Sequence, residues 1–152
     1  MVNMNSRWNW PLRLTSMIAI VTLVAGCIGS TAGQMTLPAD THSKSIYFVE
    51  RHAKDGRNLA ETIAERMRAR GLNATSGTTA DPKRPHDYVV QYTDKWMWDM
   101  RMYLADLRIE LRDPKDQSIV GFGQSSQSSL KAMGKSHVDV IDAALNELFK
   151  PR

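Results

Sequence analysis

The chain has a single cysteine, Cys27, among its 152 residues, and no acidic residue precedes Asp40. A lone cysteine excludes an intrachain disulfide and any metal site that needs two thiolates. Long apolar runs are also scarce, since the most apolar segment, Leu14–Gly26, covers only 13 residues. A helix that crosses a bilayer needs about 20 apolar residues, so this segment is too short to span one comfortably.

The sequence also lacks the common motifs of phosphate binding and nucleophilic catalysis. Gly121 and Gly123 have neither the third glycine nor the following helix of a dinucleotide-binding loop, and indicate a bulge or close packing. The serine-rich run Ser125–Ser129 lacks the spacing of a nucleophile elbow and predicts a strand end with a polar loop. We therefore expect no cofactor and no enzymatic activity.

The N-terminal segment has the layout of a secretory signal. Arg7 and Arg13 give it a positive start, and the uncharged run Leu14–Gly26 follows. This order of a basic region, a short apolar core and small residues is typical of a cleaved signal peptide. We predict a signal peptide over residues 1–26.

The five residues LVAGC, Leu23–Cys27, resemble the bacterial lipobox: an aliphatic residue, two small residues and a cysteine. In that family the cysteine sulfur is diacylated, the chain is cut before the cysteine, and its new amino group receives an acyl chain such as palmitate. The resemblance therefore implies a lipid anchor on Cys27. An ordinary signal peptide or an uncleaved anchor are the alternatives. Because Ile28 rather than an aspartate follows, the resemblance favours the periplasmic face of the outer membrane over that of the inner membrane.

Removal of residues 1–26 would leave 18 basic and 16 acidic residues, a net charge of +2 dispersed along the chain. This balance does not favour nucleic acid as a partner. Residues 28–44 are small and polar without a period, so we expect a lipidated tether over 27–44, with a short ordered arm as the alternative. The remaining residues, 45–152, form one predicted domain.

Two helices are predicted in this domain. In the first, Leu59, Ile63 and Met67 share one stripe, Asn58 or Asp55 caps the start, and Gly71 ends it. The second begins near Ser136, and Asp139 completes a capping-box pattern. Its expected apolar stripe consists of Val138, Ile141, Leu145 and Leu148.

Strands are predicted over 45–53, 87–96, 103–112 and 118–127, with a short one possible near 72–77. The even positions Tyr88, Val90, Tyr92 and Trp96 are apolar, and so are the odd positions from Tyr103 to Leu111. If these faces meet in a hairpin, a tight turn places Trp96 opposite Tyr103, Tyr92 opposite Leu107 and Val90 opposite Ile109; a longer loop keeps the same faces. The order β-α-(β)-β-β-β-α predicts an α+β two-layer sandwich, with a mainly antiparallel sheet of four or five strands and two helices on one face.

The run DKWMWDMRMY, residues 94–103, carries more large apolar side chains than the edge of a small core needs. Trp96 and Tyr103 are expected to cap the core. The remaining apolar residues are expected at the hairpin end, where an exposed patch would mark a partner or membrane contact. They are Met97, Trp98, Met100 and Met102. We therefore expect Trp98 to be more exposed than Trp96.

Two other functions stay open at this level. Met100 and Met102 share strand parity with Trp98 and would suit Cu(I), because thioethers are soft ligands. His52 near Asp55, or His86 beside Asp87, could supply acid–base chemistry for an envelope hydrolase, although basic neighbours and prolines around them indicate solvated strand ends and loops.

The stretch YTDKWMWDM, followed by an alternating strand and RDP, is similar to small proteobacterial lipoproteins over roughly Ser45–Phe149. Together with the lipobox, this resemblance implies a location and a fold, and no particular activity. The function expected from the sequence is a membrane-anchored periplasmic lipoprotein. It would act as a non-enzymatic binding or accessory module with an envelope protein as partner.

Overall fold

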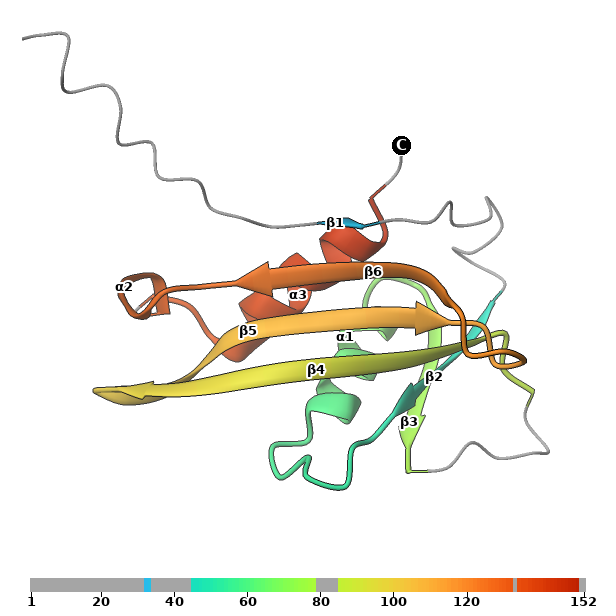
Figure 1. Cartoon of the computed structure of the whole chain (residues 1–152), viewed down its shortest axis with the longest axis horizontal. Helices are drawn as coiled ribbons and strands as arrows, with labels where there is room; N and C mark the ends of the chain where they lie inside the picture. Colours follow the sequence, from blue (N-terminus) through green and yellow to red (C-terminus); the bar gives the residue numbers. More distant parts are fainter. Residues whose placement is uncertain (1–31, 34–44, 79–84, 133, 151–152) are drawn as a thin grey trace, which may run out of the picture.

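A computed structural model describes residues 32–33, 45–78, 85–132 and 134–150. The strands are β1 Ala32–Gly33, β2 Ile46–Glu50, β3 Asn73–Gly77, β4 Tyr88–Asp99, β5 Arg101–Arg112 and β6 Ile119–Ser126. The helices are α1 Leu59–Arg68, α2 Ser129–Ala132 and α3 His137–Leu148. One sheet contains all these strands in the order β1-β6-β5-β4-β2-β3 (Figure 1).

The predicted α+β two-layer sandwich is confirmed. α1 and α3 cover one face of the sheet, and their buried stripes meet the inward residues of β2, β4 and β5 in a single core. The sheet is mixed, because β1, β6, β5 and β4 are antiparallel neighbours whereas β2 is parallel to both β3 and β4. The parallel β2–β3 pair follows from the connection through α1, since a helical crossover returns the chain in the same direction.

Three details differ from the expectation. The short strand β1 lies in the segment predicted as a tether, and pairs with Phe122 and Gly123 of β6. The serine-rich run continues into the short helix α2 rather than a loop. On α3, Val138 is only half-buried, and the buried stripe is Val140, Ile141, Ala144, Leu145 and Leu148.

The start of α1 is capped from outside the helix. Asn58 adopts a left-handed conformation with φ 55° and its side chain makes no capping hydrogen bond. The carboxylate of Asp55 accepts hydrogen bonds from the backbone N–H groups of Leu59 and Ala60 at 2.9 and 3.0 Å. Burial opposes ionisation of this carboxylate, but these bonds and one from the Tyr92 hydroxyl prevail and lower the pKa of Asp55. Of the two predicted caps, Asp55 is the one used.

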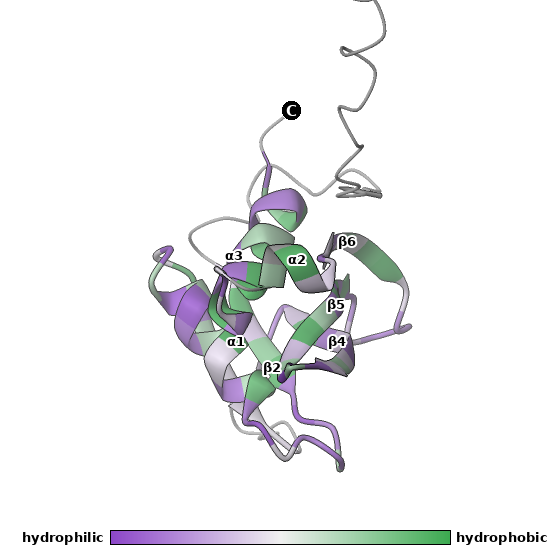
Figure 2. Ribbon diagram, turned by 90° about the vertical axis from the view of Figure 1, so that its left-hand side faces the viewer, coloured by the Kyte–Doolittle hydropathy of each residue, from purple (hydrophilic) through white to green (hydrophobic). Residues whose placement is uncertain are grey.

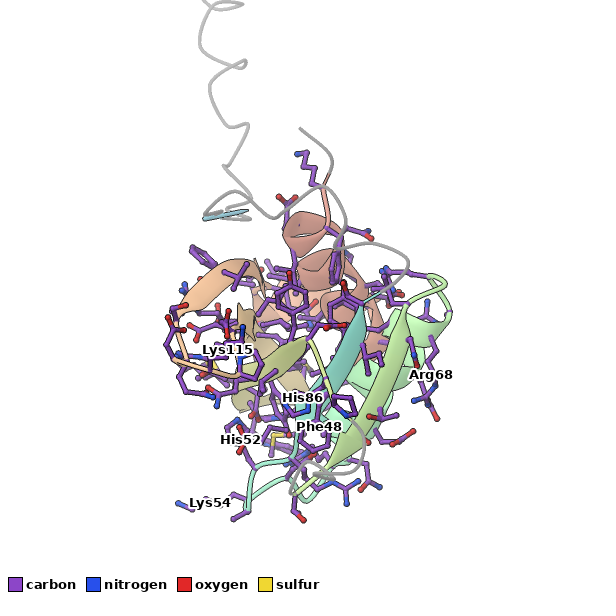
Figure 3. All side chains as sticks on the ribbon, turned by 90° about the vertical axis from the view of Figure 1, so that its right-hand side faces the viewer. Phe48, His52, Lys54, Arg68, His86 and Lys115 are labelled. Atoms are coloured by element: carbon purple, nitrogen blue, oxygen red, sulfur yellow. The ribbon has the colours of Figure 1, made fainter. Side chains whose placement is uncertain are left out.

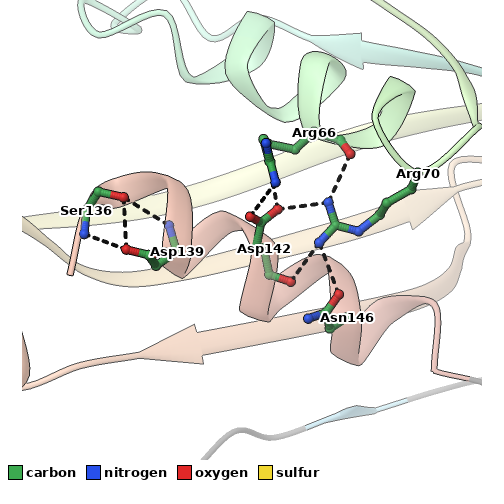
Figure 4. A network of polar contacts seen from close by, with 6 residues as sticks. All are labelled: Arg66, Arg70, Ser136, Asp139, Asp142 and Asn146. Carbon is green, nitrogen blue, oxygen red and sulfur yellow. Dashed lines mark hydrogen bonds and ion pairs between the residues drawn. The ribbon is translucent and has the colours of Figure 1, made fainter.

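The predicted capping box of α3 is confirmed. The Asp139 N–H donates to the Ser136 hydroxyl oxygen at 3.3 Å, while the Asp139 carboxylate accepts from the Ser136 N–H at 2.7 Å (Figure 4). Two groups left unpaired at a helix start are thereby satisfied. The box fixes where α3 begins, immediately beside the strands that carry the hairpin.

Polar contacts join the two helices across the layer. Asp142 of α3 accepts from Arg66 of α1 at 2.7 and 2.9 Å, and from Arg70 at 2.8 Å (Figure 4). Partial burial raises the pKa of Asp142. The hydrogen bonds from the two guanidinium groups together lower the pKa by more than burial raises it, so the net shift is downward. This contact keeps α1 and α3 aligned on the sheet.

Gly123 of β6 lies where α3 approaches the sheet most closely. A Cβ atom at this position would be 2.1 Å from the Ala144 carbonyl oxygen and 2.6 Å from the Leu148 backbone nitrogen. Both of these atoms belong to the backbone of α3, so no side-chain rotation can relieve the overlap. The close packing predicted for this glycine is therefore present.

We predict that Gly123→Ala destabilises the domain by about 1–3 kcal/mol, because α3 must move away from the sheet. Gly134→Ala is the matched control, since nothing lies within 4 Å of a Cβ atom there; its effect should stay within about 0.5 kcal/mol. Urea denaturation of both variants measures the difference. Equal midpoints would contradict the close approach.

Candidate contact surface at the hairpin end

β4 and β5 form the longest strand pair, and their register sets the hairpin end. In the inner part Val90 opposes Leu111 and Tyr92 opposes Ile109. Even positions of β4 thus face odd positions of β5, as predicted. Each β4 residue pairs with a β5 residue two positions later in the sequence than the tight-turn register predicts. All four of these residues are buried in the core.

A β-bulge then changes the register towards the turn. Lys95 pairs with Asp106, but Trp96 pairs with Leu104, so Ala105 is the additional residue of β5. Leu104 therefore enters the core, and Trp96 packs against the core edge beside it. The expected pairing of Trp96 with Tyr103 is wrong.

Tyr103 and Ala105 are buried in a different place from the one predicted. Together with Ala132 of α2 they form a small separate cluster. The strand period explains the change, because one extra residue moves every following side chain to the opposite face. Trp96 is thus the only one of the two predicted capping residues that packs on the main core.

Beyond the bulge, the four apolar residues predicted at the tip of the hairpin are exposed. We call this group of four residues the hairpin end. Its exposed fractions are 44% for Met97, 70% for Trp98, 89% for Met100 and 45% for Met102. Trp98 pairs with Met102, whereas Met97 pairs with Tyr103, so Met97 and Trp98 point to opposite faces of the hairpin. Met100 forms the reversal with φ 59°.

Trp96 has a very different environment from Trp98. Its indole N–H donates to the Asp94 carboxylate at 2.8 Å, and the Arg57 guanidinium lies 4.4 Å from its ring centre. The His137 ring at the start of α3 lies 6.3 Å away. These contacts hold Trp96 at the core edge, so the predicted order of exposure of the two tryptophans is confirmed.

Depressions flank the hairpin end. One, of about 270 Å³, lies between the turn and α2 and is lined by Met100, Tyr103, Ser129, Leu130 and their neighbours. Leu130 is 81% exposed. The second, of about 210 Å³, lies between Trp96, Met102 and the start of α3. The view onto this end shows α2 and the β4–β5 hairpin together at the near side (Figure 2).

All exposed large hydrophobic residues of the described ranges therefore gather at one end of the molecule: the hairpin end and Leu130. Sequence reasoning missed Leu130, because it expected a polar loop there. The apolar Leu130 within a serine-rich run was the one available signal.

The two histidines proposed for catalysis are held separately. The His52 ring packs edge-on against Tyr92, and its Nε2 contacts the Tyr92 carbonyl oxygen. His86 packs on Phe48, which pairs with Val89 (Figure 3). Three residues of strand, about 10 Å, separate Val89 from Tyr92, so the two rings do not share one site.

Asp55, the expected acidic partner of His52, is used as the helix cap and accepts a hydrogen bond from the Tyr92 hydroxyl at 2.9 Å. Burial, followed by this hydrogen bond, raises the pKa of Tyr92. A shallow depression lies beside these groups, lined by residues from His52–Asp55 and Tyr92–Asp94. The arrangement has a structural role in fixing α1 to β4.

The Cu(I) hypothesis required Met100 and Met102 to point to the same side of one strand. Met102 lies on β5, but Met100 forms the turn itself, where strand parity does not apply. In the ranges that the structure covers, no three His, Cys, Asp or Glu side chains gather in a way that could hold a metal ion. Nor is any helix in those ranges long and apolar enough to cross a membrane. Cys27, the predicted lipidation site, lies outside the described residues.

The fold places the chain among α+β two-layer sandwiches with a mixed sheet. No family model matches the chain, and no curated protein matches its sequence. Among solved structures, it is similar to a point variant of the PelC dodecamer from Paraburkholderia phytofirmans, with a TM-score of 0.52 and 17% identity over 82% of this chain and 100% of that one. The PelC dodecamer in another crystal form gives the same score and identity, over 79% and 98%. At this identity the similarity establishes the fold.

We predict that acrylamide quenches Trp98 more strongly than Trp96, because water reaches the Trp98 ring. The chain without residues 1–26 contains only these two tryptophans. Trp96→Phe leaves Trp98 as the reporter, and Trp98→Phe leaves Trp96. Equal Stern–Volmer slopes, or a shielded Trp98 in the monomer, would contradict the exposed hairpin end.

Proposed function

We propose that the chain is a non-enzymatic lipoprotein of the bacterial cell envelope, which binds another envelope component through its hairpin end. The single observation that carries the proposal is the collection of exposed apolar side chains at one end of the domain. Isolated exposed hydrophobic residues are common on proteins, but a contiguous group is typical of a contact surface. Within the described residues, the domain leaves 70% of Trp98 and 89% of Met100 exposed.

The location follows from the N-terminal segment. A basic start, a short apolar run and the LVAGC sequence support cleavage before Cys27 and a lipid anchor on its sulfur. Several acyl chains on one residue hold a protein firmly, because each buried methylene contributes about 0.8 kcal/mol. We place the protein on the periplasmic face of the outer membrane, with the inner membrane as the alternative, on the basis of Ile28.

A binding role has more support than the hydrolase. His52 and His86 are engaged at separate places, and Asp55 is committed to the cap of α1. The fold is shared at low identity with PelC, whose solved structure is a dodecamer, and this supports a role in assembly.

Self-assembly is a second candidate, which a specific observation favours. Two solved structures to which the chain is similar, both of PelC, are dodecamers. Among the strands that the structure describes, β3 is paired on one side only and forms an edge of the sheet. Sizing of the purified protein with light scattering would detect such an assembly.

The anchor is tested by Cys27→Ser. We expect this variant to remain as an unprocessed precursor or to leave the membrane fraction, because the thioether-linked lipid can form only on a cysteine. Fractionation of cells and mass spectrometry of the N-terminus measure both outcomes. Tight membrane association of the unacylated chain, with processing unchanged, would contradict the proposal.

The contact surface is tested by photo-crosslinking in intact cells. A photoreactive phenylalanine analogue in place of Trp98 should give an envelope adduct, whereas the same group in place of Glu65, an exposed residue of α1, serves as the matched control. Mass spectrometry identifies the attached molecule. Equal yields at the two positions would argue against a specific contact at the hairpin end.

A further inference from the structure

We infer that the partner of the hairpin end is the phospholipid surface itself, and that Trp98 with its neighbouring methionines inserts into the headgroup region of the bilayer. The inference rests on the proposed function, because a lipid on Cys27 is what would keep the domain beside a membrane. It goes further by giving the hairpin a partner of defined chemistry.

The shape of the hairpin end favours a fluid partner. Met97 and Trp98 point to opposite faces of the hairpin, and Met100 projects from the turn with 89% of its surface exposed. Apolar groups thus lie on both faces of the hairpin and at the turn itself. A flat protein interface would cover one face and leave the other in water, whereas a bilayer surrounds an inserted turn.

The side chains at the turn also set a depth. Trp98 is of the residue type that concentrates at membrane–water interfaces, because its ring is apolar while its N–H needs a polar partner. Asp99 and Arg101 flank the turn and pair with each other across the strands. Charged groups are costly in hydrocarbon, so the turn would enter the headgroup region and stop there.

Basic side chains lie at the level where we expect the lipid phosphates. Lys95 and Lys135 are exposed near the base of the hairpin end, and Arg101 is exposed beside the turn, against the acids Asp94 and Asp99. The Asp94 carboxylate already accepts the Trp96 indole N–H. Lys and Arg side chains extend along apolar surface while keeping their charge in water. Basic groups behind an apolar tip therefore complement phosphates behind an acyl layer.

The length of chain between the anchor and the domain permits this contact. Ala32 of β1 is opposite Gly123 of β6, and it lies only five positions after Cys27. Five extended residues span at most about 17 Å, so the middle of β6 would stay close to the lipid. Gly123 is paired with Ile109, and nine residues of β5, about 30 Å, lead from there to Met100. A moderate tilt of the sheet brings the hairpin end to the surface.

The test uses the acylated mature protein with Trp96→Phe, reconstituted into vesicles of equal parts phosphatidylethanolamine and phosphatidylglycerol. We expect Trp98 emission to move to shorter wavelength, and acrylamide quenching to fall several-fold relative to the same chain in solution. Lipids brominated near the glycerol end of the acyl chain should quench it more than lipids brominated near the methyl end. The companion protein with Trp98→Phe, which retains Trp96, should show neither change.

A matched pair of charge variants separates insertion from mere proximity. Met100→Glu places one negative charge at the turn, and Thr75→Glu places the same charge on β3, away from the hairpin end (Figure 1). We expect Met100→Glu to return Trp98 to water, with its emission and quenching as in solution, while the acylated protein stays on the vesicles. Thr75→Glu should leave the vesicle-bound signal unchanged.

The outcomes distinguish this inference from the proposed function. If Cys27 is acylated and Trp98 is quenched by acrylamide as strongly on vesicles as in solution, the hairpin inference fails and the anchor stands. If Cys27 carries no lipid in cells, the proposed function fails. The fluorescence of Trp98 in the unacylated chain, measured with added vesicles, then tests the hairpin inference on its own. Shielding of Trp98 without vesicles, in an oligomer that Met100→Glu dissolves, would assign the hairpin end to a contact between copies and overturn the inference.

Discussion

The pairing of β4 with β5 is the constraint on which most of this structure depends. It supplies the buried row of Val90, Tyr92, Ile109 and Leu111 that both helices cover. The same pairing continues past the bulge, where Trp96 and Leu104 close the core and the strands run on beyond it. One hydrogen-bonded ladder therefore builds the core and carries the exposed apolar turn.

The close approach of α3 to the sheet reinforces this arrangement. Gly123 lets the backbone of α3 come against β6, and the capping box at Ser136 and Asp139 begins the helix beside the hairpin. Asp142 then links α3 to α1 through Arg66 and Arg70. The helix layer ends where the core ends, and for this reason nothing in the described domain covers Trp98.

Much of the fold follows from local patterns in the sequence. The alternation of Leu107, Ile109 and Leu111 with Arg108 and Glu110 determines which face of β5 is buried, since only one parity hides the apolar side chains. The apolar stripe of α1 and the capping box of α3 could be predicted equally well, because each of these residue patterns is compatible with few other structures. Exposure at the turn also follows, since a reversal outside a two-helix layer has nothing to pack against.

Other features leave no such signal. Leu104 and Ala105 are both apolar, so the pattern is compatible with either of them facing the core, and the bulge could not be placed. The pairing of β1 depends on a contact between Ala32 and the distant Gly123. A run of small residues without a hydrophobic period does not predict such a contact. The cap of α1 was ambiguous because both Asp55 and Asn58 suit a helix start, and only the turn between them decides in favour of the carboxylate.

The bulge at Ala105 also makes the faces of the outer part of the hairpin independent of the inner register. Insertion or deletion of one residue at this point would exchange the two faces of the turn while the inner register of β4 and β5 stayed intact. Residues 96–104 can therefore be redesigned as a module while the packing of the core stays unchanged. Grafting this module onto other two-layer sandwiches at an equivalent bulge would transfer the apolar turn without redesign of the recipient core.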